Sequence, residues 1–305
     1  MNIGVVIVTY NRIDQLKKAL SLYVKQKYRP KYIIVVNNNS TDGTSEFLNK
    51  WSNENDQIKK YIINLTDNIG GSGGFYTGLK KASELDADWI WVADDDAYPE
   101  NDALWNSINY IKHNNIKNDI SAICGKVINN GKIDLSHRKR VSTNLLNVRQ
   151  EEVSISEYEK NSFNLNLFSY VGTLINKEHL IKAGLTEKDY FIYYDDTEHS
   201  YRLSKIGKII CIPSIKIVHD IADRTANDVD WKGYYTIRNR MLFYKKHFKK
   251  RYYIYNYLTL LIKCSIKNVL GKDKVKNNQI RIALKDSKND KKGIHELYKP
   301  GWKSS

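Results

Sequence analysis

The sequence predicts an α/β protein built on a mostly parallel sheet with helices on both faces. The first 125 residues alternate between short β-branched runs, beginning with Ile3–Thr9, and stretches with helical spacing. These runs are apolar throughout, as expected for strands that are covered on both faces. A content of 41% hydrophobic and 27% charged residues excludes a mainly disordered chain.

The expected strands and helices follow from the apolar runs and from the stretches with helical spacing. A helical pattern through Leu16 and Tyr23 comes after the first strand, and the same alternation continues to residue 93. Residues 129–165 are polar and rich in Asn, Lys and Glu, so we expect an irregular connection or a lid there. Further strands are expected at 32–36, 58–65, 89–93 and 212–218, and helices at 45–51, 79–85 (after a glycine-rich loop), 231–248, 252–270 and 274–285.

The charge divides the chain of 305 residues into two unequal parts. The net charge is +15, and residues 240–305 carry 18 Lys/Arg against 4 Asp/Glu, a net of +14. The preceding part has 31 against 30 and is almost neutral. We therefore expect a near-neutral globule followed by a basic helical region, with the boundary near residue 230.

Targeting and redox signals are weak. The three cysteines are far apart and form no C-x-x-C, so neither a disulfide framework nor a cysteine zinc site is expected. The N-terminus lacks a basic n-region, and no run approaches 18 apolar residues. These features predict a cytoplasmic protein or one on the inner face of the cell membrane.

Polar residues end all four strands of the first part. The carboxyl ends of parallel strands lie at one edge of the sheet, where α/β proteins bind ligands. Taken singly, such residues are also ordinary turn and cap residues. The polar ends are residues 9–12, 37–43, 67–74 and 94–96.

Three adjacent carboxylates, Asp94, Asp95 and Asp96, follow the strand at 89–93. They repel one another unless a cation neutralises them. Residues i and i+2 of an extended segment point the same way, so Asp94 and Asp96 share a face. Hard oxygen ligands suit Mg²⁺ or Mn²⁺, whereas the alternative is a solvated acidic turn.

The remaining candidates are a glycine-dense segment, a carboxylate pair and one histidine. Residues 68–78 lead into a helix, a place that favours phosphate, but they match neither a P-loop nor a dinucleotide motif. Asp195 and Asp196 precede a helical pattern and could supply a general base, or merely complement the helix dipole. His219 ends a strand and would be structural unless the fold places it beside Asp96.

Together these elements resemble the family-two inverting glycosyltransferases with the GT-A fold, above all the bacterial galactofuranosyl- and rhamnosyltransferases. The resemblance covers residues 1–220 and a further segment at 231–240. It rests on V-I-V-T-Y-N-R, V-V-N-N-N-S-T-D-G-T, N-I-G-G-S-G-G-F, W-V-A-D-D-D-A, S-Y-V-G-T-L, Y-Y-D-D-T-E-H-S-Y-R and W-K-G-Y-Y-T-I-R-N-R.

The resemblance implies a catalytic domain at 1–230, with a nucleotide-sugar half (1–125) and an acceptor half (126–230). It implies Mn²⁺ or Mg²⁺ on Asp94, Asp96 and His219, and Asp196 as the base beside Asp195. The donor would be UDP-galactofuranose or, alternatively, dTDP-rhamnose, and the acceptor a lipid-linked glycan. Implied donor residues are Thr9, Tyr10, Arg12, Asn38, Asp67, Asn68, Gly70, Gly71, Gly74, Phe75 and Asp95. The acceptor candidates are Gly172, in a matched segment, and the aromatic residues Tyr194, Trp231 and Tyr235, which could stack on sugar faces or equally belong to the core.

The basic region 231–305 has an apolar, aromatic run at 252–262 with lysines on both sides. A helix of this kind suits the headgroup layer of an anionic membrane, where each basic residue contributes about 1 kcal/mol. A solvated basic face, packing on the catalytic domain, or a homo-oligomer contact are the alternatives.

Two other classes of protein compete with this interpretation. A sugar-nucleotide pyrophosphorylase would have a basic glycine-rich loop after the first strand, which residues 9–12 lack. A nucleic-acid binder would explain the basic region but not the aspartates. We therefore expect no nucleic-acid partner.

Overall fold

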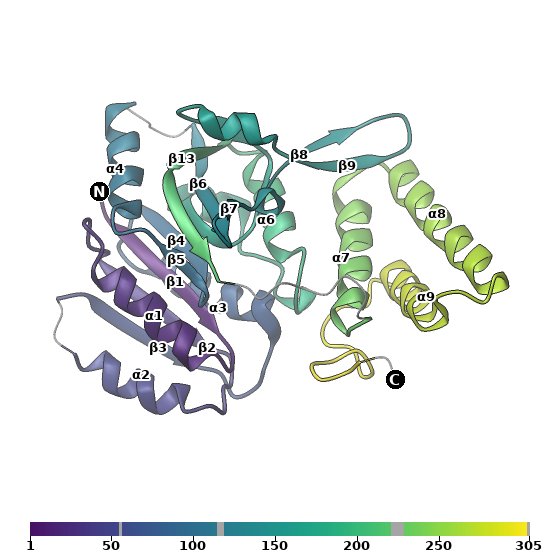
Figure 1. The fold of residues 1–305 in the computed structure, drawn as a ribbon, viewed down its shortest axis with the longest axis horizontal. Coiled ribbons are helices and arrows are strands. Elements are labelled where there is room, and N and C mark those ends of the chain that lie inside the picture. The colour runs from purple at the N-terminus through teal and green to yellow at the C-terminus, as the bar shows by residue number, and fades with distance from the viewer. Residues whose placement is uncertain (55–56, 115–118, 221–228, 304–305) are drawn as a thin grey trace.

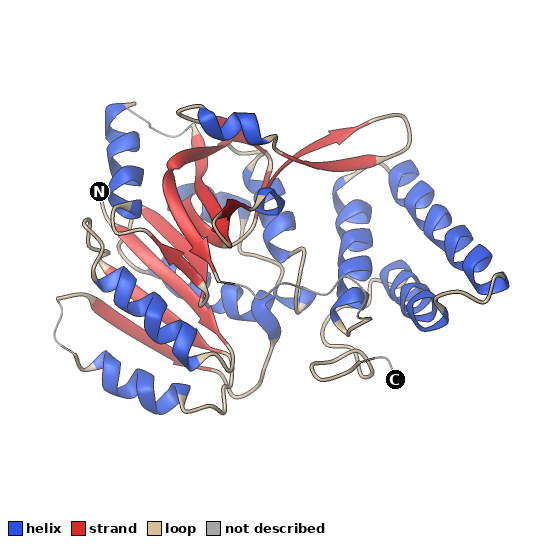
Figure 2. Ribbon diagram, viewed as in Figure 1, coloured by secondary structure: helices blue, strands red, loops and turns tan. Residues whose placement is uncertain are grey.

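The computed structural model describes residues 1–54, 57–114, 119–220 and 229–303. Figure 1 shows a sheet with helices on both sides, followed by three C-terminal helices at the opposite end of the molecule from the N-terminus. The same view coloured by secondary structure shows the strands gathered in the sheet body and one hairpin that reaches from it towards those helices (Figure 2).

The large sheet confirms the predicted α/β class. Its strands run in the order β10-β13-β6-β12-β4-β1-β2-β3, with β5 and β7 attached at its side. The first four strands are parallel, and β12 is antiparallel to β4 and β6. Their bounds are β1 Ile3–Thr9, β2 Tyr32–Asn37, β3 Lys59–Asn64, β4 Trp89–Asp94, β5 Ala97–Pro99, β6 Ile120–Asn129, β7 Lys132–Ile133, β10 Phe163–Leu165, β12 Val171–Asn176 and β13 Lys208–His219.

Alternate residues of β1 face two separate cores. Val5 and Ile7 pack with the helices on one face, and Val6 and Val8 pack with those on the other. Both faces are therefore dry, which explains the continuous apolar strands. The covering helices are α1 Ile13–Val24, α2 Thr44–Ser52 and α4 Ala103–His113 on the first face, and α3 Gly70–Glu84, α5 Lys177–Ala183 and α6 Asp195–Leu203 on the second.

The glycine-rich segment is helical, which corrects the expected loop and the helix start at residue 79. Helix α3 begins at Gly70 and contains all the glycines that follow. A Cβ on Gly74 would lie 2.5 Å from Val8, and one on Gly78 would meet Val6. The glycines therefore bring the helix close to β1, and this packing outweighs their low helix propensity.

Residues 129–165 are ordered, which corrects the expectation of an irregular connection. They contain the hairpin of β8 (Arg138–Thr143) and β9 (Val148–Glu152), which joins β11 (Leu167–Phe168) in a second sheet. Most side chains of this hairpin are partly or fully exposed, so it lacks the apolar alternation that reveals a buried strand. Its anchor is the fully buried Arg138, which donates to the carbonyl oxygens of Gly125 and Val171.

Three helices form the C-terminal region: α7 Lys232–His247, α8 Lys250–Val269 and α9 Lys274–Lys288. Their bounds agree closely with the predicted ranges. Half of the residues of α7 are buried, whereas α8 buries only Tyr252 and Cys264. Among the described residues, no helix is both long enough and apolar enough to cross a membrane. The boundary at residue 230 stays a prediction.

Candidate active site

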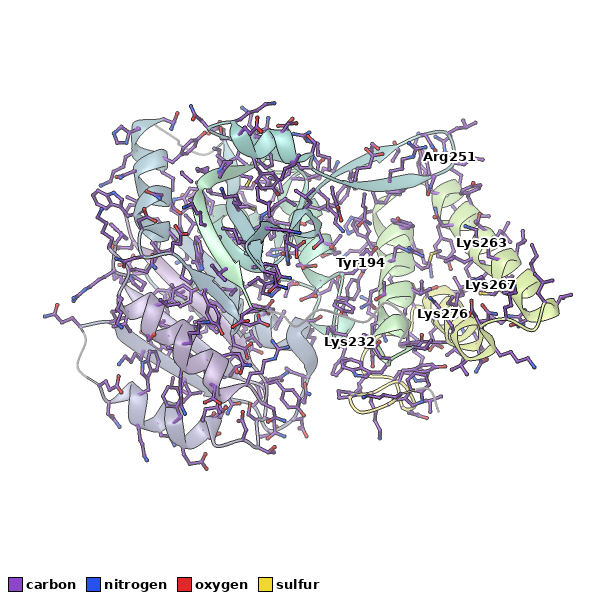
Figure 3. The ribbon with its side chains drawn as sticks, viewed as in Figure 1. Tyr194, Lys232, Arg251, Lys263, Lys267 and Lys276 are labelled. Carbon is purple, nitrogen blue, oxygen red and sulfur yellow. The ribbon has the colours of Figure 1, made fainter. Side chains whose placement is uncertain are left out.

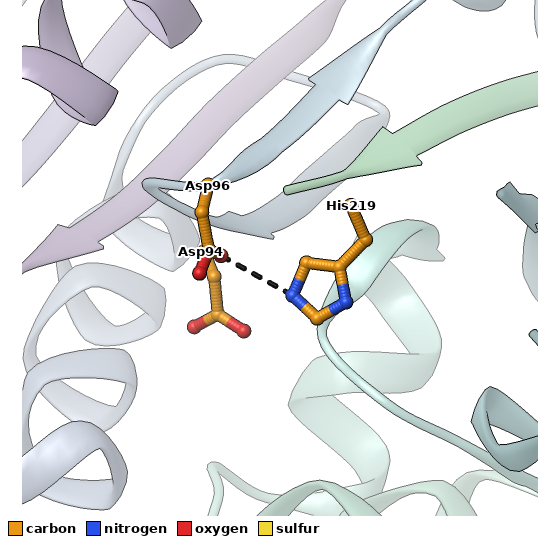
Figure 4. Close-up of side chains that lie close together, drawn as sticks. All are labelled: Asp94, Asp96 and His219. Carbon is orange, nitrogen blue, oxygen red and sulfur yellow. Dashed lines mark ion pairs between the residues drawn. The ribbon is translucent and has the colours of Figure 1, made fainter. Parts of the chain in front are cut away.

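Asp94, Asp96 and His219 meet at the edge of the large sheet. Asp94 ends β4, Asp96 lies two residues further, and His219 ends β13. Their ligand atoms lie within 4.8 Å of one another, and His219 Nε2 is 3.2 Å from Asp96 Oδ1 (Figure 4). Pairing of β5 with β13 places Ala97 opposite His219 and so fixes the histidine beside the aspartates.

These residues suit a divalent cation. Burial, and then the charges of Asp96 and Asp95, raise the pKa of Asp94 well above its usual value. A buried carboxylate among other carboxylates is stable as an anion only beside a cation. Two carboxylates and an imidazole match the ligands that Mn²⁺ or Mg²⁺ accepts. The donor set therefore fits the expected metal.

Asp95 lies in the turn between β4, which ends at Asp94, and β5, which begins at Ala97, and it is not one of the three clustered residues. It accepts a hydrogen bond from Thr9 Oγ1 at 2.7 Å and contacts Arg12 at 3.3 Å. Arg12 also reaches Asp96 at 2.5 Å. Arg12 therefore supplies the protein's own positive charge to this carboxylate group, and it lies where strand β1 ends.

Asp195 and Asp196 begin helix α6 and face the same cavity as the cluster. This cavity has a volume of about 790 Å³, and its wall includes Asp94, Asp96, His219 and both of these aspartates. Burial, and then the charge of Asp196, raises the pKa of Asp195 to about 8. Burial also raises the pKa of Asp196, against hydrogen bonds from Thr197 and the charge of Lys139. Asp196 is the less buried of the two and accepts a hydrogen bond from the Thr197 N–H, so it is the stronger candidate for a general base.

The segment before these aspartates has an unusual backbone. Phe191, Tyr193 and Tyr194 have φ values of +66°, +65° and +67°, in the left-handed region that such residues rarely adopt. Helix α7 holds this turn, because Asn239 Nδ2 lies 2.9 Å from the carbonyl oxygens of residues 190, 192 and 193. Arg238 donates a further hydrogen bond to the Tyr190 carbonyl oxygen at 3.0 Å.

The start of α3 holds the same turn from the opposite side. The backbone N–H of Ser72 donates to the Phe191 carbonyl oxygen at 3.2 Å. Gly70 has φ of +76°, and a Cβ there would collide with that oxygen. The glycine-rich segment therefore allows the turn to approach the helix, a role that its composition alone did not reveal.

A second, smaller cavity of about 230 Å³ adjoins the large one and shares Arg12, Gly71 and Asp94 with it. Thr9, Tyr10, Arg12, Asn38, Asn68, Gly70, Gly71 and Trp231 line the smaller cavity. Asn38 donates to Asn68 Oδ1 at 2.8 Å and accepts from the Ile69 backbone N–H, which fixes both amides at the cavity. Most of the expected donor residues are thus brought together.

Other expected site residues lie elsewhere. Tyr235 is fully buried and donates to the Tyr298 carbonyl oxygen, and Gly74 faces Val8. Gly172, with φ of +65°, packs against Ile217 and Trp91. Asp67 is exposed outside both cavities, whereas Phe75 and Tyr194 line the large one and Trp231 the small one.

The sequence analysis missed one wall of the large cavity. His137, Lys139 and Gln150 line it, and they belong to the hairpin region that was expected to be irregular. The His137 ring lies 5.0 Å from that of His219. The sequence did contain one local signal for a turn here, an aspartate two residues before a serine. Asp134 caps the short helical turn Leu135–His137 by accepting a hydrogen bond from the Ser136 N–H. Lys232 and Thr236 of α7 complete this wall.

Comparison with known proteins decides the family. The model of the glycosyl transferase family 2 matches residues 4–175, more than half of the chain. The chain belongs to this family. It is similar to the dTDP-rhamnosyl transferase RfbF of Shigella flexneri, with 28% identity over 81% of each chain. It is also similar to the galactofuranosyltransferase GlfT1 of Mycolicibacterium smegmatis, with 30% identity over 38% of this chain and 37% of that protein.

Solved structures of glycosyltransferases share the fold, which is of the GT-A type. GalNAc-T7, solved with UDP, GalNAc and Mn²⁺, gives a TM-score of 0.66 at 16% identity, over 95% of this chain and 57% of that one. TarS of S. aureus, residues 1–349 with UDP-GlcNAc, gives 0.62 at 14% identity, over 94% and 80%. The predicted fold class is confirmed.

Proposed function

We propose that this glycosyltransferase is metal-dependent and inverting, and that it moves a sugar from a nucleotide diphosphate onto a hydroxyl of a lipid-linked bacterial surface glycan. The observation that carries the proposal is that the Asp94–Asp96–His219 cluster and the Asp195–Asp196 pair line one cavity. A cation site and a base in the wall of one cavity are what a single displacement at an anomeric carbon requires.

Each residue then has a defined task. Asp94, Asp96 and His219 would hold Mn²⁺ or Mg²⁺, which supplies positive charge to the departing diphosphate. Asn38, Asn68 and the start of α3 bind the donor in the smaller cavity. Asp196 accepts the proton of the acceptor hydroxyl as that oxygen attacks. With one base and no protein nucleophile, the reaction is a single displacement and inverts the anomeric centre.

Two donors have support. UDP-galactofuranose rests on the form of the segment at 68–75 and on the similarity to GlfT1. dTDP-rhamnose rests on the similarity to RfbF, which extends over 81% of both chains. We place the reaction at the cytoplasmic face of the membrane, where a lipid-linked acceptor is accessible to a protein without a described membrane span.

A donor screen tests the proposal. The purified chain is incubated with UDP- and dTDP-sugars and a lipid-linked glycan acceptor, with Mn²⁺, with Mg²⁺ or with EDTA, and nucleotide release and product are measured. We expect transfer from one of the two named donors, lost with EDTA and in His219→Ala. Equal transfer with EDTA would contradict the metal dependence, and transfer only from another nucleotide sugar would contradict the donor assignment.

A further inference from the structure

Helix α8 carries an exposed apolar stripe along its length. Ile254, Leu258, Ile262 and Ile266 follow one another at intervals of four residues, so they lie along one side of the helix. Their exposed fractions are 41%, 48%, 56% and 56%, and that of Val269 is 87%. We call these five residues the α8 face. Few soluble proteins leave such a continuous apolar surface without a partner.

Another side of α8, next to the α8 face, already has its partner. Tyr253, Tyr257, Leu260 and Leu261 pack into the cluster that α8 shares with α7 and α9. The α8 face is therefore not needed to attach the helix to the protein. It lies at the end of the molecule furthest from the N-terminus, where α8 forms the outer edge (Figure 1).

The tip of the β8–β9 hairpin lies beside the first turn of α8 and is also apolar. Leu145 and Leu146 form this turn and are 75% and 42% exposed. Tyr252 of the first turn of α8 donates to the carbonyl oxygen of Asn144 at 3.1 Å, which ties the tip to the helix. Two leucines at a hairpin tip beside an apolar helix face are suited to insertion into an apolar medium.

Basic residues border the α8 face. Residues 250–288 carry 10 Lys/Arg and 2 Asp/Glu, a net of +8. Arg251, Lys263 and Lys267 of α8 and Lys276 of α9 lie at this end of the molecule (Figure 3), and all four are exposed. Lys267 pairs with Asp273, but Arg251, Lys263 and Lys276 form no ion pair with any residue that the structure describes. Their charge is thus available to an anionic partner.

We infer that the α8 face and the hairpin tip dock on an anionic lipid bilayer. An amphipathic helix with a basic border lies in the headgroup layer, with its apolar side in the acyl chains and its lysines at the phosphates. A second copy of this chain is a poorer occupant, because pairing two α8 faces would bring two sets of lysines together. Among the described residues the helix does not span the bilayer, so it lies on it.

Membrane docking extends the proposed function. The docking itself is argued from the α8 face and the hairpin tip, and only its link to a lipid-linked acceptor rests on the proposed function. The hairpin with Leu145 at its tip also carries Lys139 and Gln150 in the wall of the large cavity. One short hairpin therefore joins the proposed membrane contact to the proposed acceptor side of the cavity. A lipid-linked acceptor could then reach the cavity without leaving the bilayer.

Vesicle binding of the full chain, without donor or acceptor, tests the inference separately from catalysis. We expect sedimentation with vesicles of phosphatidylcholine and phosphatidylglycerol, none with phosphatidylcholine alone, and weakening at about 0.5 M salt. Leu258→Glu with Ile262→Glu should weaken binding at least about tenfold. Lys263→Ala and Lys276→Ala should each weaken it about fivefold. All four side chains are exposed, so circular dichroism should show an unchanged fold.

Matched controls come from α5, on the sheet body. Ile181 is 60% exposed and Lys182 lies beside it, so Ile181→Glu and Lys182→Ala should bind vesicles like the parent chain. The inference is overturned if the parent chain does not bind anionic vesicles, or if the α8 variants bind like the controls. It is also overturned if Leu258→Glu instead converts a dimer to a monomer, as light scattering would show, because the face then belongs to a second copy.

Discussion

The side-chain amide of Asn239 lies 2.9 Å from the carbonyl oxygen of Tyr193, two residues before the carboxylate pair. The same nitrogen serves the carbonyl oxygens of Tyr190 and Ile192. These oxygens belong to a turn in which three residues have left-handed backbone conformations. Such conformations cost free energy, so the turn persists only because the surrounding structure holds it. A residue of the C-terminal region thus determines where the proposed base is held.

Asn239→Ala should therefore reduce turnover more than donor binding. The turn loses its three contacts, and a displacement of about 1 Å at a reacting group can lower the rate about 100-fold. Donor affinity, measured by calorimetry with the nucleotide and Mn²⁺, should stay within about threefold, since Asn239 lines neither cavity. Asn256→Ala is the matched control, because that amide caps only a carbonyl within α8. Equal losses in both variants would indicate a general effect on folding.

Asp196→Asn should abolish transfer while donor and metal still bind. The amide keeps the shape of the side chain but accepts no proton from the acceptor hydroxyl, and loss of a general base lowers rates about 100- to 10,000-fold. Product formation and Mn²⁺-dependent nucleotide binding are measured in parallel. Normal turnover in this variant would remove Asp196 from the mechanism.

The pH dependence of activity should show an acid limb above the range of an ordinary aspartate. Burial raises the pKa of Asp196, so the base gains a proton, and activity falls, at a higher pH than an exposed carboxylate would give. A profile of kcat/KM against pH measures this limb. Lys139→Ala should move it further up, because the lysine charge favours the ionised carboxylate. A downward shift in that variant would contradict the assignment.

Asp195 should make the fold less stable as the pH rises. The pKa of Asp195 in the folded protein, about 8, lies above its value in the unfolded chain. The stability that the protonated carboxyl contributes is therefore fully present below about pH 4, and it is lost progressively as the pH rises from about 4 to about 8. The slope from this one group is at most about 1.4 kcal/mol per pH unit. Asp195→Asn removes the ionisation, so its stability relative to the parent chain should increase over this range. Thermal melts at several pH values measure the difference; a constant difference would contradict the burial of Asp195.

Gly70→Ala should destabilise the protein, whereas Gly71→Ala should not. A Cβ on Gly70 collides with the Phe191 carbonyl oxygen and requires a left-handed φ, but one on Gly71 meets no atom within 4 Å. We expect a loss of about 1 to 3 kcal/mol for the first change and little for the second, by denaturant titration. Equal stabilities would mean that α3 does not hold the turn as the structure shows.

The sequence predicted those parts of the fold and site whose signals are local. Apolar runs indicated the strands of the large sheet. The expectation that Asp94 and Asp96 lie together agrees with their positions in the cluster, although Asp96 belongs to a turn and not to the strand. The helical conformation of the glycine-rich segment was not predicted. The close packing of its glycines on β1 outweighs their low helix propensity, and no local sequence pattern encodes that packing. The hairpin at 138–152 was missed because its side chains are largely solvated, and Asn239 because a neutral amide has no signature for contacts made 46 to 49 residues away.

The contacts of helix α7 also set the order in which the site is completed during synthesis. By residue 219 the chain contains the whole acidic cluster and its histidine, but the turn before Asp195 still lacks Asn239 and Arg238. Arg238 itself donates to the carbonyl oxygen of Gly293, near the end of the chain. The residues of the proposed cation site are therefore synthesised before Asn239 and Arg238, so the unfinished chain contains them before the turn that carries the proposed base is supported.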